Sequence, residues 1–222
     1  MGLRDVATEA LSLFVVLIQH MMEEYNINQT TLKILGLYVS DYGKSLHLRE
    51  IARETAVDVK AVQLQLKRLE RVNVVSSVMR GRNKEYRLNL GNLMSRYYMV
   101  LAETFASVNY LGANFLVKKV IGEIEDHVEG IVILFGSFAR GEATKRSDID
   151  LFVISDEKID RNGIMDVGNR VGREISVKSA DKAQFLKGLV EGDPLIREVV
   201  SSHVVLKGID EFCDIMWRYY AK

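Results

Sequence analysis

The sequence predicts an α+β protein of two domains, in which helices and a β-hairpin precede an α/β domain with a mixed sheet. Residues 29–92 show three short helical patterns followed by two β-rich runs, and the second half alternates strand-like and helical runs. With 222 residues, the chain is long enough for two modest hydrophobic cores. Its 48% hydrophobic and 27% charged residues are typical of a soluble globular protein.

The first 28 residues are expected to form an amphipathic helix that packs on the protein and pairs two subunits into a homodimer. Its apolar stripe has a spacing of three or four residues and comprises Leu3, Val6, Ala10, Phe14, Leu17, Met21 and Tyr25. The apolar run from Leu11 to Ile18 is shorter than the ~20 residues that a membrane span needs, and no small-residue cleavage site follows it. We therefore expect no membrane segment, and membrane contact through this helix is the alternative.

Residues 29–92 are predicted to form the first domain. Asp58 is expected to cap its third helix. A glycine and an asparagine in the run from Met79 to Lys84 suit the turn of a hairpin. The expected elements are helices over Thr31–Tyr42, Ser45–Thr55 and Val59–Arg71 and strands over Val72–Val78 and Glu85–Leu90.

The net charge of zero hides a basic segment in this domain. Between Asp41 and Leu90 there are eleven basic and six acidic residues, a local net charge of +5 that favours a polyanionic partner. Three helices and a hairpin in this order resemble a winged helix-turn-helix domain. The resemblance implies binding of double-stranded DNA, with the third helix in the major groove and the wing on phosphates. The alternative is a domain that serves protein contacts only. The candidate DNA-binding residues are Lys60, Gln63, Gln65, Lys67 and Arg68 on the helix and Arg80, Arg82 and Lys84 on the wing.

Residues 93–118 are predicted to form a connector helix and residues 119–222 the second domain. The aromatic residues of the connector are expected to pack in a core or an interface. Gly112 is expected to interrupt the helical pattern. Downstream elements are expected over residues 161–173, 174–179, 182–190, 203–207 and 209–220.

The most informative segment runs from Ile131 to Val153. An apolar run ends in Gly136-Ser137, and Asp148-Ile149-Asp150 opens a second run. Strand alternation puts both aspartates on one face with Ile149 in the core behind them. Paired carboxylates repel each other, and a divalent cation relieves that repulsion. A glycine allows close backbone approach, and a serine at a helix start offers hydrogen bonds to an anion. Together these residues predict a site for a metal-bound nucleoside triphosphate.

This segment resembles the signature of minimal nucleotidyltransferases in the polymerase-β-like superfamily. The matching stretches are Gly136-Ser-Phe-Ala-Arg-Gly141 and Ser147-Asp-Ile-Asp-Leu151. The resemblance implies that Asp148 and Asp150 hold two Mg²⁺ ions. It also implies nucleotide contacts by Gly136, Ser137, Arg140 and Ser147, and transfer of a nucleoside monophosphate with release of pyrophosphate. Lys145 and Arg146 add positive charge nearby, or are solvated surface.

The superfamily supplies a third carboxylate from a later strand, and this chain departs from that pattern. The alignment places Ser176 at that position, and serine is neither a good magnesium ligand nor a general base. Glu174 lies two residues away on the same strand face and is our candidate for the third catalytic acid. Asp181 is expected to cap the next helix instead.

Two functions follow from the sequence. The first is a Mg²⁺-dependent enzyme that transfers NMP, most simply AMP from ATP, to a hydroxyl of a protein or small molecule. Toxin–antitoxin pairs suggest a partner toxin as acceptor. A separate alternative is a nucleic-acid-modifying enzyme that uses its winged helix to hold the substrate. The second is a transcription regulator whose nucleotidyltransferase domain has become a nucleotide sensor or a dimerisation module. The single Cys213 excludes an intrachain disulfide and fits a reducing, cytoplasmic compartment, and the four histidines have no zinc-ligand spacing.

Overall fold

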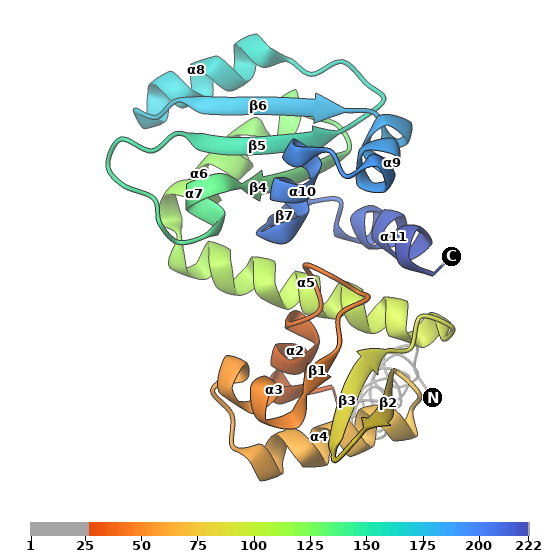
Figure 1. Cartoon of the computed structure of the whole chain (residues 1–222). Coiled ribbons are helices and arrows are strands. Elements are labelled where there is room, and N and C mark those ends of the chain that lie inside the picture. The colour runs from red at the N-terminus through yellow and green to blue at the C-terminus, as the bar shows by residue number, and fades with distance from the viewer. Residues whose placement is uncertain (1–26, 222) are drawn as a thin grey trace, which may run out of the picture.

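The computed structural model describes residues 27–221. The chain forms two units, each with its own β-sheet, and a long helix runs between them (Figure 1). The helix predicted over the first 28 residues lies almost wholly outside the described residues. Among those that are described, no helix combines the length and the apolar character that crossing a membrane requires.

The N-terminal unit contains the three helices and the hairpin expected from the sequence, together with one further short strand. Its sheet is antiparallel, in the order β1-β3-β2. Asn28 caps the first helix, and Asp58 caps the third through the backbone N–H groups of Lys60 and Ala61, as predicted. The elements are α2 (Gln29–Gly36), β1 (Leu46–His47), α3 (Leu48–Thr55), α4 (Val59–Arg71), β2 (Val75–Arg80) and β3 (Asn83–Leu88).

Two boundaries in this unit differ from the prediction. The first helix was expected to reach Tyr42, but it ends at Gly36. Tyr38 remains buried beyond that end because its hydroxyl donates to the carbonyl of Tyr86 at 3.0 Å. The second helix was expected from Ser45, but Leu46 pairs with Tyr86 as a strand residue and is buried there. A capping box between His47 and Glu50 then starts α3.

Helix α5 (Leu93–Ala113) packs against both units. On the N-terminal side it lies on α2, and the hydroxyl of Ser95 donates to the carbonyl of Val74 at 3.2 Å. On the C-terminal side the hydroxyl of Ser107 donates to the carbonyl of Val205 at 2.7 Å. The helix ends at Ala113, one residue beyond the glycine that was expected to break it, and Asn114 is both its C-cap and the N-cap of the next helix.

The C-terminal unit is a mixed four-stranded sheet in the order β6-β5-β4-β7, which confirms the predicted mixed sheet. Strand β4 is antiparallel to both β5 and β7, whereas β5 and β6 are parallel. Its strands are β4 (Ile131–Phe135), β5 (Ile149–Ile154), β6 (Ile175–Ala180) and β7 (Val204–Lys207). Its helices are α6 (Phe115–Ile124), η1 (Glu125–His127), α7 (Gly136–Ala139), α8 (Arg161–Val171), α9 (Lys182–Glu191), α10 (Pro194–Ser201) and α11 (Ile209–Tyr220).

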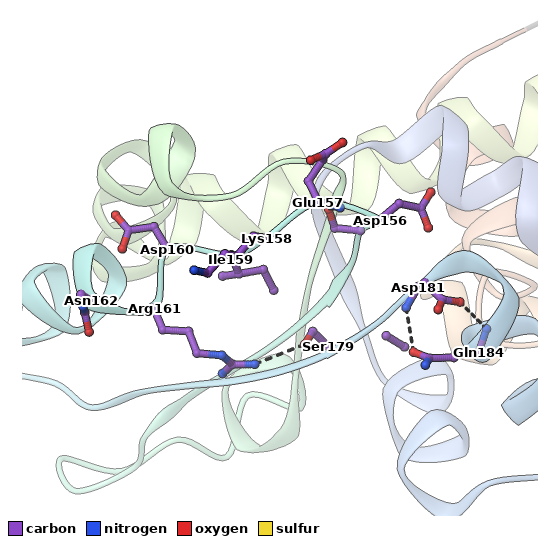
Figure 2. Close-up of a pocket in the computed structure, with 12 residues that line it drawn as sticks. Asp156, Glu157, Lys158, Ile159, Asp160, Arg161, Asn162, Ser179, Asp181 and Gln184 are labelled. Carbon is purple, nitrogen blue, oxygen red and sulfur yellow. Dashed lines mark hydrogen bonds between the residues drawn. The ribbon is translucent and has the colours of Figure 1, made fainter.

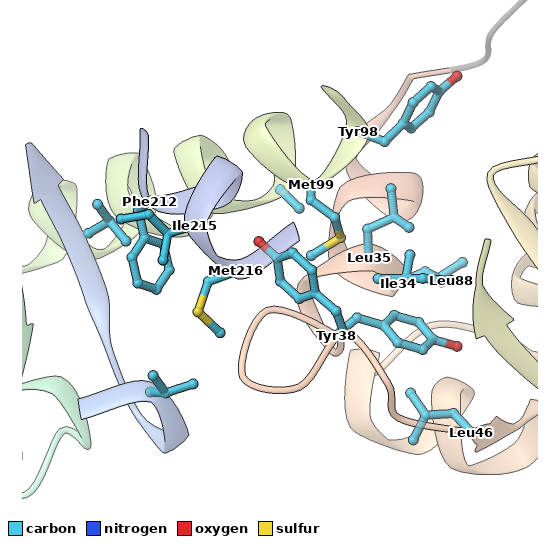
Figure 3. Close-up of a cluster of buried hydrophobic side chains, with 14 of the residues drawn as sticks. Ile34, Leu35, Tyr38, Leu46, Leu88, Tyr98, Met99, Phe212, Ile215 and Met216 are labelled. Carbon is cyan, nitrogen blue, oxygen red and sulfur yellow. The ribbon is translucent and has the colours of Figure 1, made fainter. Parts of the chain in front are cut away.

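Alternation along the strands gives this sheet two distinct apolar faces. Ile149, Leu151 and Val153 pack with α6 and α8 in one cluster. Phe152 and Ile154 face the other way, toward α9, α10 and α11. This second cluster continues through α5 into the N-terminal unit, where side chains of α2, α5 and α11 meet (Figure 3). The two units therefore share one continuous hydrophobic core.

Candidate functional site

The two aspartates of the sequence motif lie where β5 begins, beside the end of β4. Ile149 between them is fully buried, as alternation predicts, while Asp148 is exposed and Asp150 is half-buried. Asp150 pairs across the sheet with Phe135, the last residue of β4. The motif therefore brings its glycine and its aspartates together at one edge of the sheet.

Gly136 is in direct contact with Asp150. Its φ of +69° lies in the left-handed region that favours glycine. A Cβ at this position would lie 2.5 Å from Oδ2 of Asp150, closer than any side chain tolerates. Only glycine therefore lets the chain turn from β4 into α7 over the carboxylate.

The electrostatic surroundings of Asp150 are those of a crowded acidic site. Burial raises the pKa of its carboxyl above the ordinary value, and the negative charges of Asp148 and Glu198 raise that pKa further. The positive charges of Lys178 and Arg140 oppose the rise. A cation placed between Asp148 and Asp150 would relieve this repulsion.

Ser137 lies in the short helix α7 that follows the glycine. Its side chain is half-buried, and its carbonyl accepts from the N–H of Glu142 at 2.9 Å. The hydroxyl of Tyr110 on α5 donates to the carbonyl of Phe138 at 3.0 Å. The turn that carries Gly136 and Ser137 is thus tied to the long helix.

Arg140 at the end of α7 is exposed and forms ion pairs with two carboxylates. Its Nε lies 2.8 Å from Glu142, and its Nη1 lies 3.4 Å from Glu198 on α10. Glu198 was not found from the sequence because α10 itself was not predicted. The Asp193-Pro194 pair was the available signal, since an N-cap aspartate followed by proline marks a helix start.

Strand β6 shows what stands at the position of the expected third carboxylate. Ser176 lies directly opposite Asp150 in the parallel ladder, beside the aspartate motif. Glu174 precedes the strand and is exposed, and its backbone carbonyl accepts a hydrogen bond from the N–H of Ile149. It lines a groove of about 600 Å³ between α8 and β6. Glu198 is therefore the further carboxylate that acts on Asp150.

The loop between the glycine and aspartate motifs is braced by a residue that the sequence reasoning missed. The guanidinium of Arg173 donates to the carbonyls of Thr144, Lys145 and Ser147. Ser147, a predicted nucleotide contact, uses its hydroxyl to accept from the N–H of Thr144 at 2.9 Å. In this structure Ser147 shapes the loop. Lys145 and Arg146 are exposed at its tip.

A large cavity lies elsewhere in the C-terminal unit. It measures about 890 Å³ and is formed by the segments that follow β5 and β6, whereas the aspartates lie where β5 begins. Figure 2 shows its polar lining, in which Arg161 donates to Ser179 and Asp181 exchanges hydrogen bonds with Gln184. These partners are already satisfied by one another, so cavity size does not locate the chemistry here.

Some of the candidate DNA-binding residues on α4 are exposed, whereas others are buried or half-buried. Lys60, Gln63 and Lys67 are exposed on one side of α4. Gln65 was offered as a further contact, but it is buried, with its Oε1 3.5 Å from the hydroxyl of Thr31. Arg68 is half-buried.

On the wing, the three basic residues have different surroundings. Lys84 lies 2.8 Å from Glu70, which raises the pKa of its amine. Arg80 lies 3.2 Å from Glu85. Arg82 is exposed in the turn between the two strands. Arg82 is therefore better placed than Arg80 and Lys84 to contact a partner.

Comparison with known proteins identifies the second unit. Residues 118–212 match the family model described as "Polymerase beta, Nucleotidyltransferase", so this part of the chain is a nucleotidyltransferase-family domain. A protein of Methanocaldococcus jannaschii, whose provisional name is protein adenylyltransferase, is 30% identical over 77 residues. That alignment covers 35% of this chain and 54% of the relative, so the chain spans about half of that relative's length.

Comparison with solved structures gives only weak matches. The YusO protein from Bacillus subtilis is 17% identical and aligns over 58% of this chain and 100% of its own, with a TM-score of 0.32. Human N-acetylserotonin methyltransferase in complex with SAM is also 17% identical, over 52% of this chain and 34% of its own, with a TM-score of 0.29. At such low scores neither likeness carries an argument.

Proposed function

We propose that the C-terminal unit transfers a nucleoside monophosphate from an NTP to a hydroxyl group of a protein or small molecule. The observation that carries this proposal is the contact between Gly136 and Asp150, which joins the glycine turn and the paired aspartates of the motif in one place. The family match supports nucleotidyl transfer in general. The provisional name of the M. jannaschii relative favours ATP as the donor.

The residues at this edge fit magnesium when a nucleotide is bound. Within residues 27–221, no three His, Cys, Asp or Glu side chains gather into a metal site on their own. Mg²⁺ does not need such a cage, because it is commonly held by one or two carboxylates together with substrate phosphates and water. Asp148 and Asp150 would hold the two ions. When bound, the ions lower the pKa of the acceptor hydroxyl and neutralise charge on the departing pyrophosphate.

The remaining side chains would orient the substrate. The hydroxyl of Ser137 would donate to the terminal phosphates, and the exposed Arg140 would add positive charge beside them. The guanidinium of Arg140 now contacts Glu142 and Glu198, and a triphosphate would compete with these carboxylates for it. Glu198 would then supply the further carboxylate near Asp150. Glu174, our candidate from the sequence, would need to turn from the α8 side of the sheet to do so.

We further propose that the N-terminal unit is a winged helix-turn-helix that binds double-stranded DNA. The order of its elements and the exposed Lys60, Gln63 and Lys67 on α4 support this function. An enzyme with such a unit could modify a partner toxin while the DNA-binding unit controls the operon, as the sequence resemblance suggests.

A second function has its own supporting observation. Ser176 stands opposite Asp150, where a catalytic carboxylate is expected from the family pattern. A chain that binds nucleotides without turnover would be a transcription regulator with a nucleotide-sensing domain.

Product analysis separates the two functions. The protein is incubated with Mg²⁺ and each α-labelled NTP, with lysate proteins and small-molecule alcohols as acceptors. Transfer of label with stoichiometric pyrophosphate release, lost in Asp150→Asn, supports the enzyme. Magnesium-dependent binding with no transfer to any acceptor and no pyrophosphate supports the sensor.

A further inference from the structure

Helix α5 exposes an apolar seam that neither proposed function uses. Its members are Met94, Tyr97, Leu101, Thr104 and Val108, which we call the α5 seam. Tyr97 is 49% exposed, Leu101 39% and Val108 63%. Large apolar side chains gathered at this level of exposure along one helix mark an interaction surface.

The seam is free of charge for a structural reason. Within the described helix, the charged residues are Arg96 and Glu103. Neither is a member of the seam, although the guanidinium of Arg96 lies 5.6 Å from the ring centroid of Tyr97. Arg96 pairs with Asp210 at 3.0 Å and Asp214 at 3.5 Å, on α11. Glu103 is buried and pairs with His203 at 3.2 Å. Both charged residues of this 21-residue helix are thus paired with groups of the C-terminal unit, and no member of the seam is itself charged.

The spacing of the seam suits another α-helix. Met94, Leu101 and Val108 lie seven residues apart, and Tyr97 and Thr104 occupy the intervening positions three residues on. This is the a and d pattern of helices that pack by knobs into holes. The seam faces away from the side of α5 on which Met99 and Ala102 enter the core.

We propose that the α5 seam is a homodimer interface in which α5 of one chain packs against α5 of a second copy. A twofold interface requires a surface that is complementary to itself, and an uncharged apolar seam meets its own copy without opposing like charges. Helix α5 runs between the two units (Figure 1), and none of the seam residues belongs to α4 or to the aspartate motif. This inference is independent of nucleotide transfer.

The first test is the oligomeric state of the full-length chain by light scattering after size exclusion. Wild type is expected at about twice the 25.2 kDa of one chain, and Leu101→Glu with Val108→Glu at the mass of one chain. Met165→Glu with Val190→Glu is the matched control, because those side chains are 58% and 65% exposed on α8 and α9. The control should remain dimeric. A monomeric wild type, or a seam variant that stays dimeric, would overturn the proposal.

A second test does not depend on a destabilising substitution. Thr104→Cys places a thiol in the middle of the seam, where the two copies approach, and oxidation should give a covalent dimer. The native Cys213 is buried, which raises the pKa of its thiol to about 12, so it does not compete. Met165→Cys is the control and should remain uncrosslinked. Equal crosslinking of both variants contradicts the interface.

The segment before residue 27 is the alternative location of the dimer interface. The double substitution Phe14→Glu with Leu17→Glu changes the apolar stripe of this segment and leaves the sequence of α5 unaltered. If this variant is monomeric while the seam variant stays dimeric, the interface lies in that segment. That result would overturn the assignment of the interface to α5.

Discussion

At the scale of single residues, the site depends on the close contact between Gly136 and Asp150. The motif was readable in the sequence because the glycine, the serine and the aspartates lie within one β-turn-β segment. Glu198 and Arg173 could not be found in this way, since they reach the site from α10 and from the end of α8. Local motifs reveal residues that share an element, whereas tertiary packing brings in the others.

Replacing Gly136 by alanine should abolish nucleotide binding. The new Cβ would displace the carboxylate of Asp150, and the backbone strain of a left-handed alanine would add about 1–2 kcal/mol. We expect at least a hundredfold loss of Mg²⁺–NTP affinity by calorimetry.

Gly81→Ala is the matched control for this change. Gly81 has a similar φ of +62° but no atom within 4 Å of the position of a Cβ. It should therefore lose comparable stability and keep nucleotide affinity. A similar loss of affinity in both variants would show that backbone strain, not contact with Asp150, is responsible.

At the scale of elements, the patterns of α4 and α11 gave correct bounds because each has a clear apolar stripe and a distinct start. Leu46 was assigned to a helix because a strand of only two residues is too short to show alternation of buried and exposed side chains. The contacts that hold α5 to the C-terminal unit were not visible in the sequence. They include the buried pair of Glu103 and His203.

This buried pair makes stability depend on pH. Burial lowers the pKa of His203, but the carboxylate of Glu103 and the carbonyl of Val200 together outweigh that effect and leave the pKa above the ordinary 6.5. A raised histidine pKa contributes stability that is complete below pH 6.5 and is lost as the pH rises through the raised value. The Tm of wild type should exceed that of Glu103→Gln most at pH 6, and the gap should narrow toward pH 9. A gap that does not change with pH would contradict this pairing.

The wing residues should differ in their contribution to DNA binding. Arg82→Ala should weaken binding to all sequences and reduce the dependence of log affinity on log salt by ~1, as loss of one phosphate contact does. Lys84→Ala should alter the salt dependence less, because Glu70 already holds that amine. Titrations of labelled duplex at several salt concentrations measure both. Equal slopes for the two variants would show that Lys84 leaves Glu70 to contact DNA.

At the scale of the whole molecule, the sequence predicted an α+β chain with two units, and the structure adds that their cores are continuous. Met99 of α5, Leu35 of α2 and Met216 of α11 belong to one cluster. Hydrophobic periodicity shows which side of each helix is buried but not which partner covers it, so this continuity could not be predicted. The site itself lies at the ends of the two central strands of the C-terminal sheet, away from α4.

The central claim is that Asp148 and Asp150 form a magnesium-dependent nucleotide site that is separable from DNA binding. The most direct measurement is calorimetric titration of ATP and the other NTPs, with and without Mg²⁺, into wild type and into Asp148→Asn with Asp150→Asn. We predict magnesium-dependent binding that the double variant loses, with DNA affinity unchanged. Absence of binding to every NTP, or binding that survives in the double variant, would contradict the claim.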